Sequence, residues 1–362
     1  MSISIDNALT IDVEDYFQVH AFSSVIRYQD WANYECRIER NTYRILEILS
    51  NPYGFVTPAH HSSLITHHLI KATFFILGWI AERYPGLVRD IAAQGHEVAS
   101  HGYRHELVSK QTPGEFRSDV SRTKKILEDI TGKEVFGYRA STYSITRKTL
   151  WALKILAEEG YKYDSSIFPV HHDVYGFPEA PRFPFKVSLN GQPSPKSLLQ
   201  NPPCPPSKSP LPPFKIPAAP LFKRGVRGDS RGYEGIQGNM GGVKGVGEDF
   251  WEFPISTGRL LGQNIPIAGG GYFRLLPYWF ARKSLEQINE HEQSPFIFYI
   301  HPWEFDPDQP KINGAPLRSR LRHYLNLDKV ENRFRKLLSD FNFVPIRDLM
   351  DKKPSAPFAS LR

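Results

Sequence analysis

Strand-like and helix-like segments alternate along most of this chain, and this alternation limits its fold more than any other feature. Residues 71–78 form a continuous apolar run, residues 79–94 have helical spacing that Gly95 ends, and a second apolar run follows. Such alternation predicts a mostly parallel sheet in an α/β fold. The part of the chain with this pattern has about 300 residues, which is the size of a (β/α) barrel.

The remaining elements are predicted from the same periodicities and from their end signals. Thr112 and Glu115 have the spacing of a capping box, and Gly132 is placed to stop the helix that they begin. Further helices are predicted at 38–49, 112–130, 146–159, 277–289 and 328–341, and further strands at 8–16, 134–138, 161–166, 295–301 and 343–346.

One segment interrupts this pattern. Residues 186–248 contain 11 prolines and 10 glycines and have no hydrophobic period, which predicts a disordered insertion. We therefore expect one domain made of residues 1–185 and 249–350, followed by a tail at 351–362. The fold must then bring Arg182 and Phe250 close together.

The insertion also explains the charge of the chain. Its nine Lys/Arg and three acidic residues give +6 of the formal net charge of +7. The rest is near neutral, so we expect no nucleic-acid partner. No apolar run is long enough to span a bilayer, and the N-terminus lacks the basic and apolar segments of a signal peptide, so we expect a cytoplasmic protein.

Two histidines four residues apart, His101 and His105, follow a strand end, and residues at this spacing lie side by side on one helical turn. Two imidazoles and a carboxylate can hold a divalent metal with positions left open. Three acids, Asp12, Glu14 and Asp15, end the first strand. Asp12 and Glu14 point to the same side of a strand, so Glu14 is the preferred ligand, with Asp15 as the alternative.

Polar residues end further strands as well, and a barrel would gather all of them around one mouth. These further residues are Arg139, Asp164 and His301. The glycine triplet at 269–271 does not stand between a strand and a helix in the manner of a phosphate-binding loop, so it predicts no nucleotide site. Residues 51–69 read as a polar surface loop, and we leave its histidines out of the site.

As a set, these residues resemble the motifs of the polysaccharide deacetylases of carbohydrate esterase family 4. The matching segments are 10–15 (TIDVED), 100–105 (SHGYRH), 139–141 (RAS), 164–166 (DSS) and 299–301 (YIH). Residues 301–307 (HPWEFDP) and the tail are most similar to the subgroup associated with exosortase and exopolysaccharide gene clusters. The chain departs from the family in having residues 12–15 (DVED) where an Asp-Asp pair is usual, so that either Glu14 or Asp15 could be the ligand, and Ser141 where a proline is usual.

The resemblance implies a distorted (β/α)7 barrel that removes N-acetyl groups from a sugar polymer or its precursor in exopolysaccharide biosynthesis. In the family pattern Arg139 holds the base, Asp164 orients the acid, and a backbone N–H near Thr142 faces the oxyanion. The implied site residues are Glu14, His101 and His105 for the metal, Asp12 as general base, His301 as general acid, and Arg139 and Asp164 as their supports. Zinc is the default metal for these ligands, and cobalt or nickel would fit too.

Two other functions are compatible with the sequence. One is hydrolysis of a small non-sugar amide on the same fold, and the other is a catalytically inactive sugar-binding module. Aromatic residues favour an open sugar-stacking groove, although they are equally ordinary in a core: Trp251, Tyr272, Phe273 and Trp303. An inactive module predicts loss of the base or the acid, and both Asp12 and His301 are present.

Overall fold

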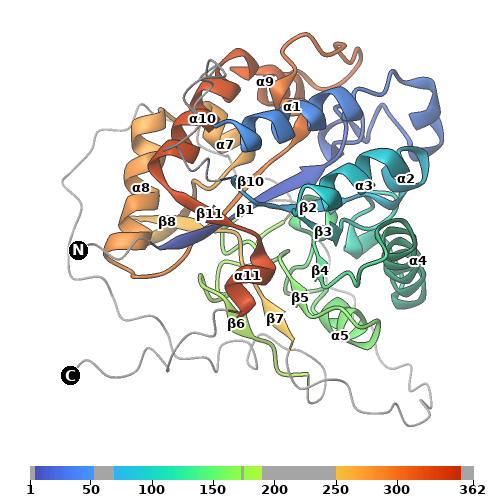
Figure 1. The fold of residues 1–362 in the computed structure, drawn as a ribbon, viewed down its shortest axis with the longest axis horizontal. Coiled ribbons are helices and arrows are strands. Elements are labelled where there is room, and N and C mark those ends of the chain that lie inside the picture. Colours follow the sequence, from blue (N-terminus) through green and yellow to red (C-terminus); the bar gives the residue numbers. More distant parts are fainter. Residues whose placement is uncertain (1–4, 53–68, 173–174, 190–249, 352–362) are drawn as a thin grey trace, which may run out of the picture.

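The computed structural model describes residues 5–52, 69–172, 175–189 and 250–351, and a curled sheet runs through its centre (Figure 1). Hydrogen bonding gives the strand order β10-β1-β2-β3-β4-β5-β7-β6, with β11 also paired to β1. The strands are β1 (Asp6–Val13), β2 (Thr73–Ile76), β3 (Glu97–Ser100), β4 (Gly137–Tyr138), β5 (Tyr163–Asp164), β6 (Phe185–Lys186), β7 (Trp251–Glu252), β10 (Ile297–Ile300) and β11 (Asn342–Val344).

The seven strands from β10 to β7 in this order are parallel to one another, and β6 is antiparallel to β7. Helices surround the sheet on its outside (Figure 1). This arrangement is the distorted (β/α) barrel expected from the alternation of elements. The sides of the barrel meet through the segment after β7, because Ser256 Oγ accepts a hydrogen bond from the backbone N–H of Ile297, at 2.8 Å. A separate hairpin of β8 (Thr257–Leu260) and β9 (Gln263–Pro266) follows.

The described part of the chain contains α-helices and short 3-10 helices. The α-helices are α1 (Ile38–Ser50), α2 (Gly78–Arg83), α3 (Pro85–Ala93), α4 (Pro113–Thr131), α5 (Trp151–Glu158), α7 (Gly270–Leu275), α8 (Tyr278–Glu290), α9 (Leu317–Tyr324), α10 (Val330–Asp340) and α11 (Ile346–Asp351). The 3-10 helices are η1 (His20–Phe22), η2 (Tyr28–Asn33), η3 (Val108–Lys110), η4 (Ser141–Tyr143), η5 (Pro302–Phe305) and η6 (Leu327–Lys329).

Two helix predictions need correction. The single helix expected at 79–94 is two, because Pro85 has no N–H to donate and the second helix starts at that proline. The helix expected from residue 146 starts only at Trp151, after a run of turns. The capped helix α4 is confirmed: Thr112 Oγ1 accepts from the backbone N–H of Glu115, and Gly132 adopts the left-handed conformation with φ of 65°.

Alternation along the strands separates two apolar layers. Phe74 and Ile76 of β2 pack in the large cluster with Leu9, Ile11 and other residues between the sheet and the helices. Phe75, by contrast, packs in a second cluster with side chains from six other strands and loops on the inside of the barrel. Because Asp12 stands one residue from Ile11 on the same strand, its side chain points into this interior.

The glycine triplet has a packing role. Gly269 extends the sheet beside β10, where Tyr299 donates its N–H to the carbonyl oxygen of Ala268 at 3.0 Å. The φ of Gly269 is 135°. A Cβ at this position would lie 1.9 Å from the carbonyl oxygen of Tyr299. The first glycine is therefore needed for close approach to β10, and the triplet then begins α7.

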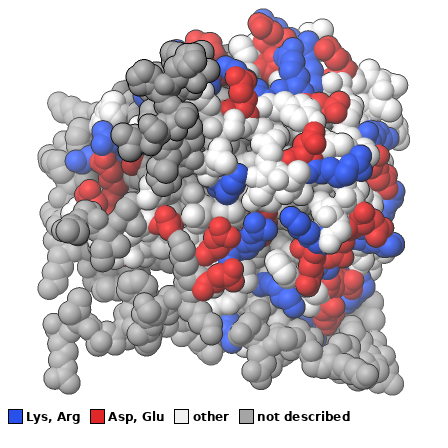
Figure 2. Space-filling model, viewed as in Figure 1, with Lys and Arg blue, Asp and Glu red and all other residues white. Residues whose placement is uncertain are grey.

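The predicted insertion lies almost wholly outside the described residues, as do most of the loop at 51–69 and the tail after residue 351. Its two ends do meet as expected: β6 pairs with β7, and Val187 donates to Phe250 O at 2.8 Å. Figure 2 shows Lys/Arg and Asp/Glu interspersed over the described part of one face. Within the described ranges, no helix combines the length and apolar character needed to cross a membrane.

Candidate active site

The candidate metal ligands come together at the carboxyl ends of β1 and β3. Glu14 Oε2 lies 2.8 Å from His105 Nε2, and one ligand atom from each of Glu14, His101 and His105 falls within 4.8 Å of the others. All three side chains are almost completely buried. Among the described residues this is the one cluster of three or more such side chains with metal-ligand spacing.

Each ligand is prepared in a way that fits a metal. His101 Nδ1 donates to the carbonyl oxygen of Arg139 at 2.8 Å, so its Nε2 carries the free lone pair. Burial lowers the pKa of His101 to about 4, which keeps it neutral. In the described part of the chain, Glu14 Oε2 is buried without a hydrogen-bond partner, although His105 Nε2 is so near. A buried carboxylate oxygen beside two imidazole nitrogens fits a divalent cation.

The choice between the two acids now has a geometric basis. Asp15 turns away and caps the next segment: its Oδ2 accepts from the N–H of Arg37 at 2.6 Å, and its Oδ1 from the N–H of Tyr16 at 2.8 Å. Burial raises the pKa of Asp15 to about 6. Burial would also raise the pKa of Glu14, but neighbouring His105 lowers it well below its ordinary value. Glu14 is therefore the carboxylate that faces the histidines.

Asp12 is held by two side chains. Arg139 Nη1 donates to Asp12 Oδ1 at 2.6 Å, and the hydroxyl of Tyr143 donates to Oδ2 at 3.2 Å. Arg139 is fully buried and is itself fixed by Nε to Ser165 O at 2.9 Å and by Nη1 to Thr10 Oγ1 at 2.7 Å. Asp12 consequently has a fixed orientation in the mouth of the barrel.

Tyr143 was not predicted from sequence. It follows Thr142 in η4, and both residues have φ of 53°, in the left-handed region that is unfavourable for side chains with a Cβ. Such strain in adjacent residues is typical of functional loops. The loop starts where Ala140 donates its N–H to Ser166 Oγ at 2.7 Å, and Ser166 in turn donates to Asp164 Oδ1 at 2.5 Å.

The role expected for Asp164, which was to orient His301, belongs to another acid. His301 Nδ1 donates to Glu304 Oε1 at 2.7 Å, so Glu304, and not Asp164, orients this imidazole. Asp164 instead supports the Ala140 loop, and burial raises its pKa to about 6. Glu304 stands three residues after His301, the spacing of a capping box, and this is the sequence signal that would have found it.

His301 completes the site from β10. Its Nε2 lies 3.5 Å from Glu14 Oε1 and 3.9 Å from Asp12 Oδ2. Burial would lower the pKa of His301, but the hydrogen bond to Glu304 and the nearby Glu14 raise it to about 9. Behind it, Arg274 Nε donates to Glu304 Oε2 at 2.6 Å. Nε2 of His301 thus points into the space between Asp12, the expected base, and Glu14, the expected metal ligand.

The expected aromatic groove is only partly present. Phe273 is fully buried in the core, so it lines no groove, whereas Trp251 and Tyr272 are half-buried. Trp303 is buried beside the site: its ring stacks on that of His301, with centroids 5.3 Å apart, and its Nε1 donates to Glu14 Oε1 at 3.3 Å. Trp303 therefore positions site residues and offers no open stacking face.

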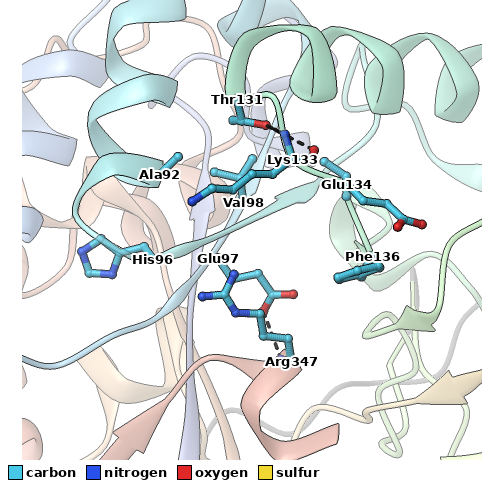
Figure 3. Close-up of a pocket in the computed structure, with 10 residues that line it drawn as sticks. Ala92, His96, Glu97, Val98, Thr131, Lys133, Glu134, Phe136 and Arg347 are labelled. Atoms are coloured by element: carbon cyan, nitrogen blue, oxygen red, sulfur yellow. Dashed lines mark hydrogen bonds between the residues drawn. The ribbon is translucent and has the colours of Figure 1, made fainter. Parts of the chain in front are cut away.

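A second polar cluster lies at the opposite end of the sheet, where β3 begins (Figure 3). Buried Glu97 accepts from Thr73 Oγ1 at 2.6 Å, from the hydroxyl of Tyr163 at 3.0 Å and from the backbone N–H of Arg347 at 3.1 Å. Beside it, His96 Nδ1 accepts a backbone hydrogen bond from the residue before β2, at 3.2 Å. These contacts attach α11 to the end of the sheet opposite the candidate site, beside a pocket that His96, Glu97 and Arg347 help to line.

Two family models and several known proteins match parts of this chain. Residues 56–163 match the family model Polysaccharide deacetylase, and residues 225–351 match DUF3473, a domain of unknown function. A peptidoglycan-N-acetylglucosamine deacetylase of Bacillus cereus is 38% identical over 68 residues, which are 19% of this chain and 25% of that protein. A chitooligosaccharide deacetylase of Bradyrhizobium is 29% identical over 118 residues, which are 33% of this chain and 50% of that protein.

A solved structure from Mycobacterium smegmatis, provisionally assigned as a polysaccharide deacetylase, covers 100% of this chain with 15% identity and a TM-score of 0.49. The chain spans a quarter to a half of the length of the two curated relatives above. Over part of its length, the chain is therefore similar to polysaccharide deacetylases. The subgroup suggested by residues 301–307 is not distinguished by them, although a DUF3473 segment is present.

Proposed function

We propose that this relative of the polysaccharide deacetylases is a metal-dependent hydrolase that removes N-acetyl groups from an N-acetylated sugar polymer or its precursor, in exopolysaccharide biosynthesis. The observation that carries the proposal is the arrangement around one point: Glu14, His101 and His105 on one side, Asp12 and His301 facing them. Hydrolysis of an amide needs an activated water, a stabilised oxyanion and an acid for the amine, and each has a candidate here.

A divalent metal fits the three ligands, and when bound it would polarise the acetyl carbonyl and lower the pKa of a water molecule. Zinc suits two imidazoles and a carboxylate, and cobalt or nickel is compatible with the same donors. Two features of this chain support a divalent metal: Glu14 Oε2 is buried without a hydrogen-bond partner, and His101 is neutral.

Asp12 is the proposed general base. Its Oδ2 faces the site, while Oδ1 is paired with Arg139 at 2.6 Å. The ion pair with Arg139 holds the carboxylate in place, so that Oδ2 stays turned toward the water that it would deprotonate. Tyr143 limits rotation of the carboxylate by its hydrogen bond to Oδ2, and that oxygen keeps a second lone pair for the water.

His301 is the proposed general acid. The hydrogen bond to Glu304 fixes Nδ1 as a donor and directs Nε2–H toward the site, where the departing nitrogen would receive the proton. Tyr143 and Ser144 donate their N–H groups to Ala140 and Ser141, so we assign the backbone contact to the oxyanion to Thr142. Ser141, which stands where a proline is usual in the family, precedes Thr142 and Tyr143, the two residues with a φ of 53°.

The test is acetate release from a panel of N-acetylated glycans and small N-acetyl amides, with and without a chelator. We expect release from a glycan, loss with chelator, and recovery when zinc is returned. Asp12→Asn and His301→Ala should keep the metal and lower turnover ~100-fold or more each. The matched control is Asp15→Asn, which changes a nearby acid that caps the backbone.

Other outcomes select the alternatives. Hydrolysis of small amides only would favour a non-sugar amidase on this fold. Glycan binding without any acetate release, in protein that carries its metal, would show an inactive binding module and overturn the proposal.

A further inference from the structure

Helix α9 has its apolar side chains on the wrong face for a helix that packs on a core. Leu317, Leu321 and Leu325 recur every four residues and are 70%, 60% and 41% exposed. The face turned to the protein carries instead a histidine, His323, which is 3% exposed. Its Nε2 donates to Gln309 Oε1 at 2.6 Å, which fixes the helix without using the leucines.

The exposed row continues beyond the helix. Arg274 donates to the carbonyl oxygen of Leu325 at 3.1 Å, and Asn326 donates to the carbonyl oxygen of Arg274 at 3.0 Å, so the backbone of residue 275 lies beside the end of α9. Leu275, the last residue of α7, is 52% exposed. We call this set the leucine row: Leu317, Leu321, Leu325 and Leu275.

Basic side chains accompany the leucine row. Arg318 and Arg322 each follow an exposed leucine and are exposed themselves. Residues 309–329 contain five Lys/Arg and a single acid, Asp328. Leucines beside arginines are a combination that anionic bilayer surfaces bind, with the apolar side chains in the interface and the cations at the headgroups.

We propose that the leucine row is a docking surface for an anionic lipid bilayer. A second copy of the chain is a poor occupant, because a symmetric contact through α9 would bring arginines against arginines. Side chains exposed to this degree also project from the surface rather than line a groove for a peptide. The inference rests on this surface alone and does not depend on the proposed hydrolysis.

Docking would have a consequence for the site. The ring of His323 stacks on Trp303, with centroids 4.1 Å apart, and Trp303 stacks on His301. The lipid-facing helix is therefore separated from the candidate acid by two aromatic rings. A bilayer bound at α9 would lie beside the mouth of the barrel.

The experiment is flotation of the full chain with vesicles of phosphatidylcholine alone and with vesicles in which phosphatidylglycerol replaces about a third of it. We expect binding to the anionic vesicles. The triple variant Leu317→Ser, Leu321→Ser and Leu325→Ser should weaken it about tenfold or more. Leu261→Ser is the matched control, because Leu261 is 95% exposed at the turn of the β8–β9 hairpin. This control should bind like the unmodified chain.

A second variant, Arg318→Gln with Arg322→Gln, should reduce binding to the anionic vesicles and leave the weak binding to phosphatidylcholine unchanged. Circular dichroism of each variant shows whether the fold is kept, and single Leu→Ser variants replace the triple one if it unfolds. Failure of the unmodified chain to float, or equal flotation of the triple variant, would overturn the proposal. The proposal would also be overturned if sedimentation velocity showed that the leucine row joins two copies of the chain.

Discussion

The buried pair of Arg274 and Glu304 permits a quantitative test of how the candidate acid is held. Arg274 is 3% exposed and Glu304 is fully buried, and their side chains meet at 2.6 Å. Glu304 also accepts from His301 at Nδ1 and at the backbone N–H. Replacing Glu304 with leucine leaves the guanidinium buried without its anion, which should cost about 3–5 kcal/mol of the free energy of unfolding.

The double variant separates the charge from the packing. Arg274→Met with Glu304→Leu removes both charges and loses the hydrogen bonds that Arg274 donates to the carbonyl oxygens of His323 and Leu325. Each such bond contributes about 1 kcal/mol net, so the double variant should lose only about 1–3 kcal/mol beyond the two bonds from His301 to Glu304, which both variants lose. It should therefore be more stable than Glu304→Leu alone by about 2 kcal/mol.

Urea unfolding followed by tryptophan fluorescence, with chelator present so that metal binding does not contribute, measures these values. Asp129→Leu is the control, because its pair with Lys125 is 65% and 77% exposed and contributes about 0–0.5 kcal/mol. A loss in Glu304→Leu no larger than in the control would show that the pair is not desolvated. A double variant less stable than the single one would refute the argument about the stranded charge.

Three further predictions follow from single contacts. Glu14→Gln should lower metal occupancy, measured by elemental analysis, far more than Asp15→Asn does; the opposite ranking would assign the wrong ligand. Burial lowers the pKa of His96 to about 4, so its neutral form adds stability that is complete above about pH 6.5 and is lost as the pH falls through 4, up to about 3 kcal/mol. A urea series over that range should flatten in His96→Gln, and an unchanged slope would contradict this. Gly269→Ala should cost more than about 2 kcal/mol, because its Cβ would overlap the carbonyl oxygen of Tyr299, and a melting temperature like that of the unmodified chain would exclude this crowding.

Sequence alone determined the class of fold and named most residues of the candidate site. Periodicity and caps are short-range signals, so the alternation of elements, the capped helix that ends at Gly132 and the parallel sheet could be predicted from local residues. The spacing of His101 and His105 marked them as a candidate pair of ligands, but the helical turn expected there is absent: residues 101–105 form a bend, and His105 has a φ of 52°. That Asp12 faces the interior followed from the period of two in a strand.

Tertiary structure decided which side chains meet. Glu304 rather than Asp164 holds His301, and Tyr143 reaches Asp12, because these pairings depend on how η5 and η4 follow their strands around the barrel. Strand order and register bring together residues more than a hundred positions apart, and no local pattern records such distances. The preference for Glu14 could be stated from sequence, but only the cap that Asp15 makes on the segment of Arg37 gives it a physical reason, since a carboxylate satisfied by backbone N–H groups is not free to face a metal.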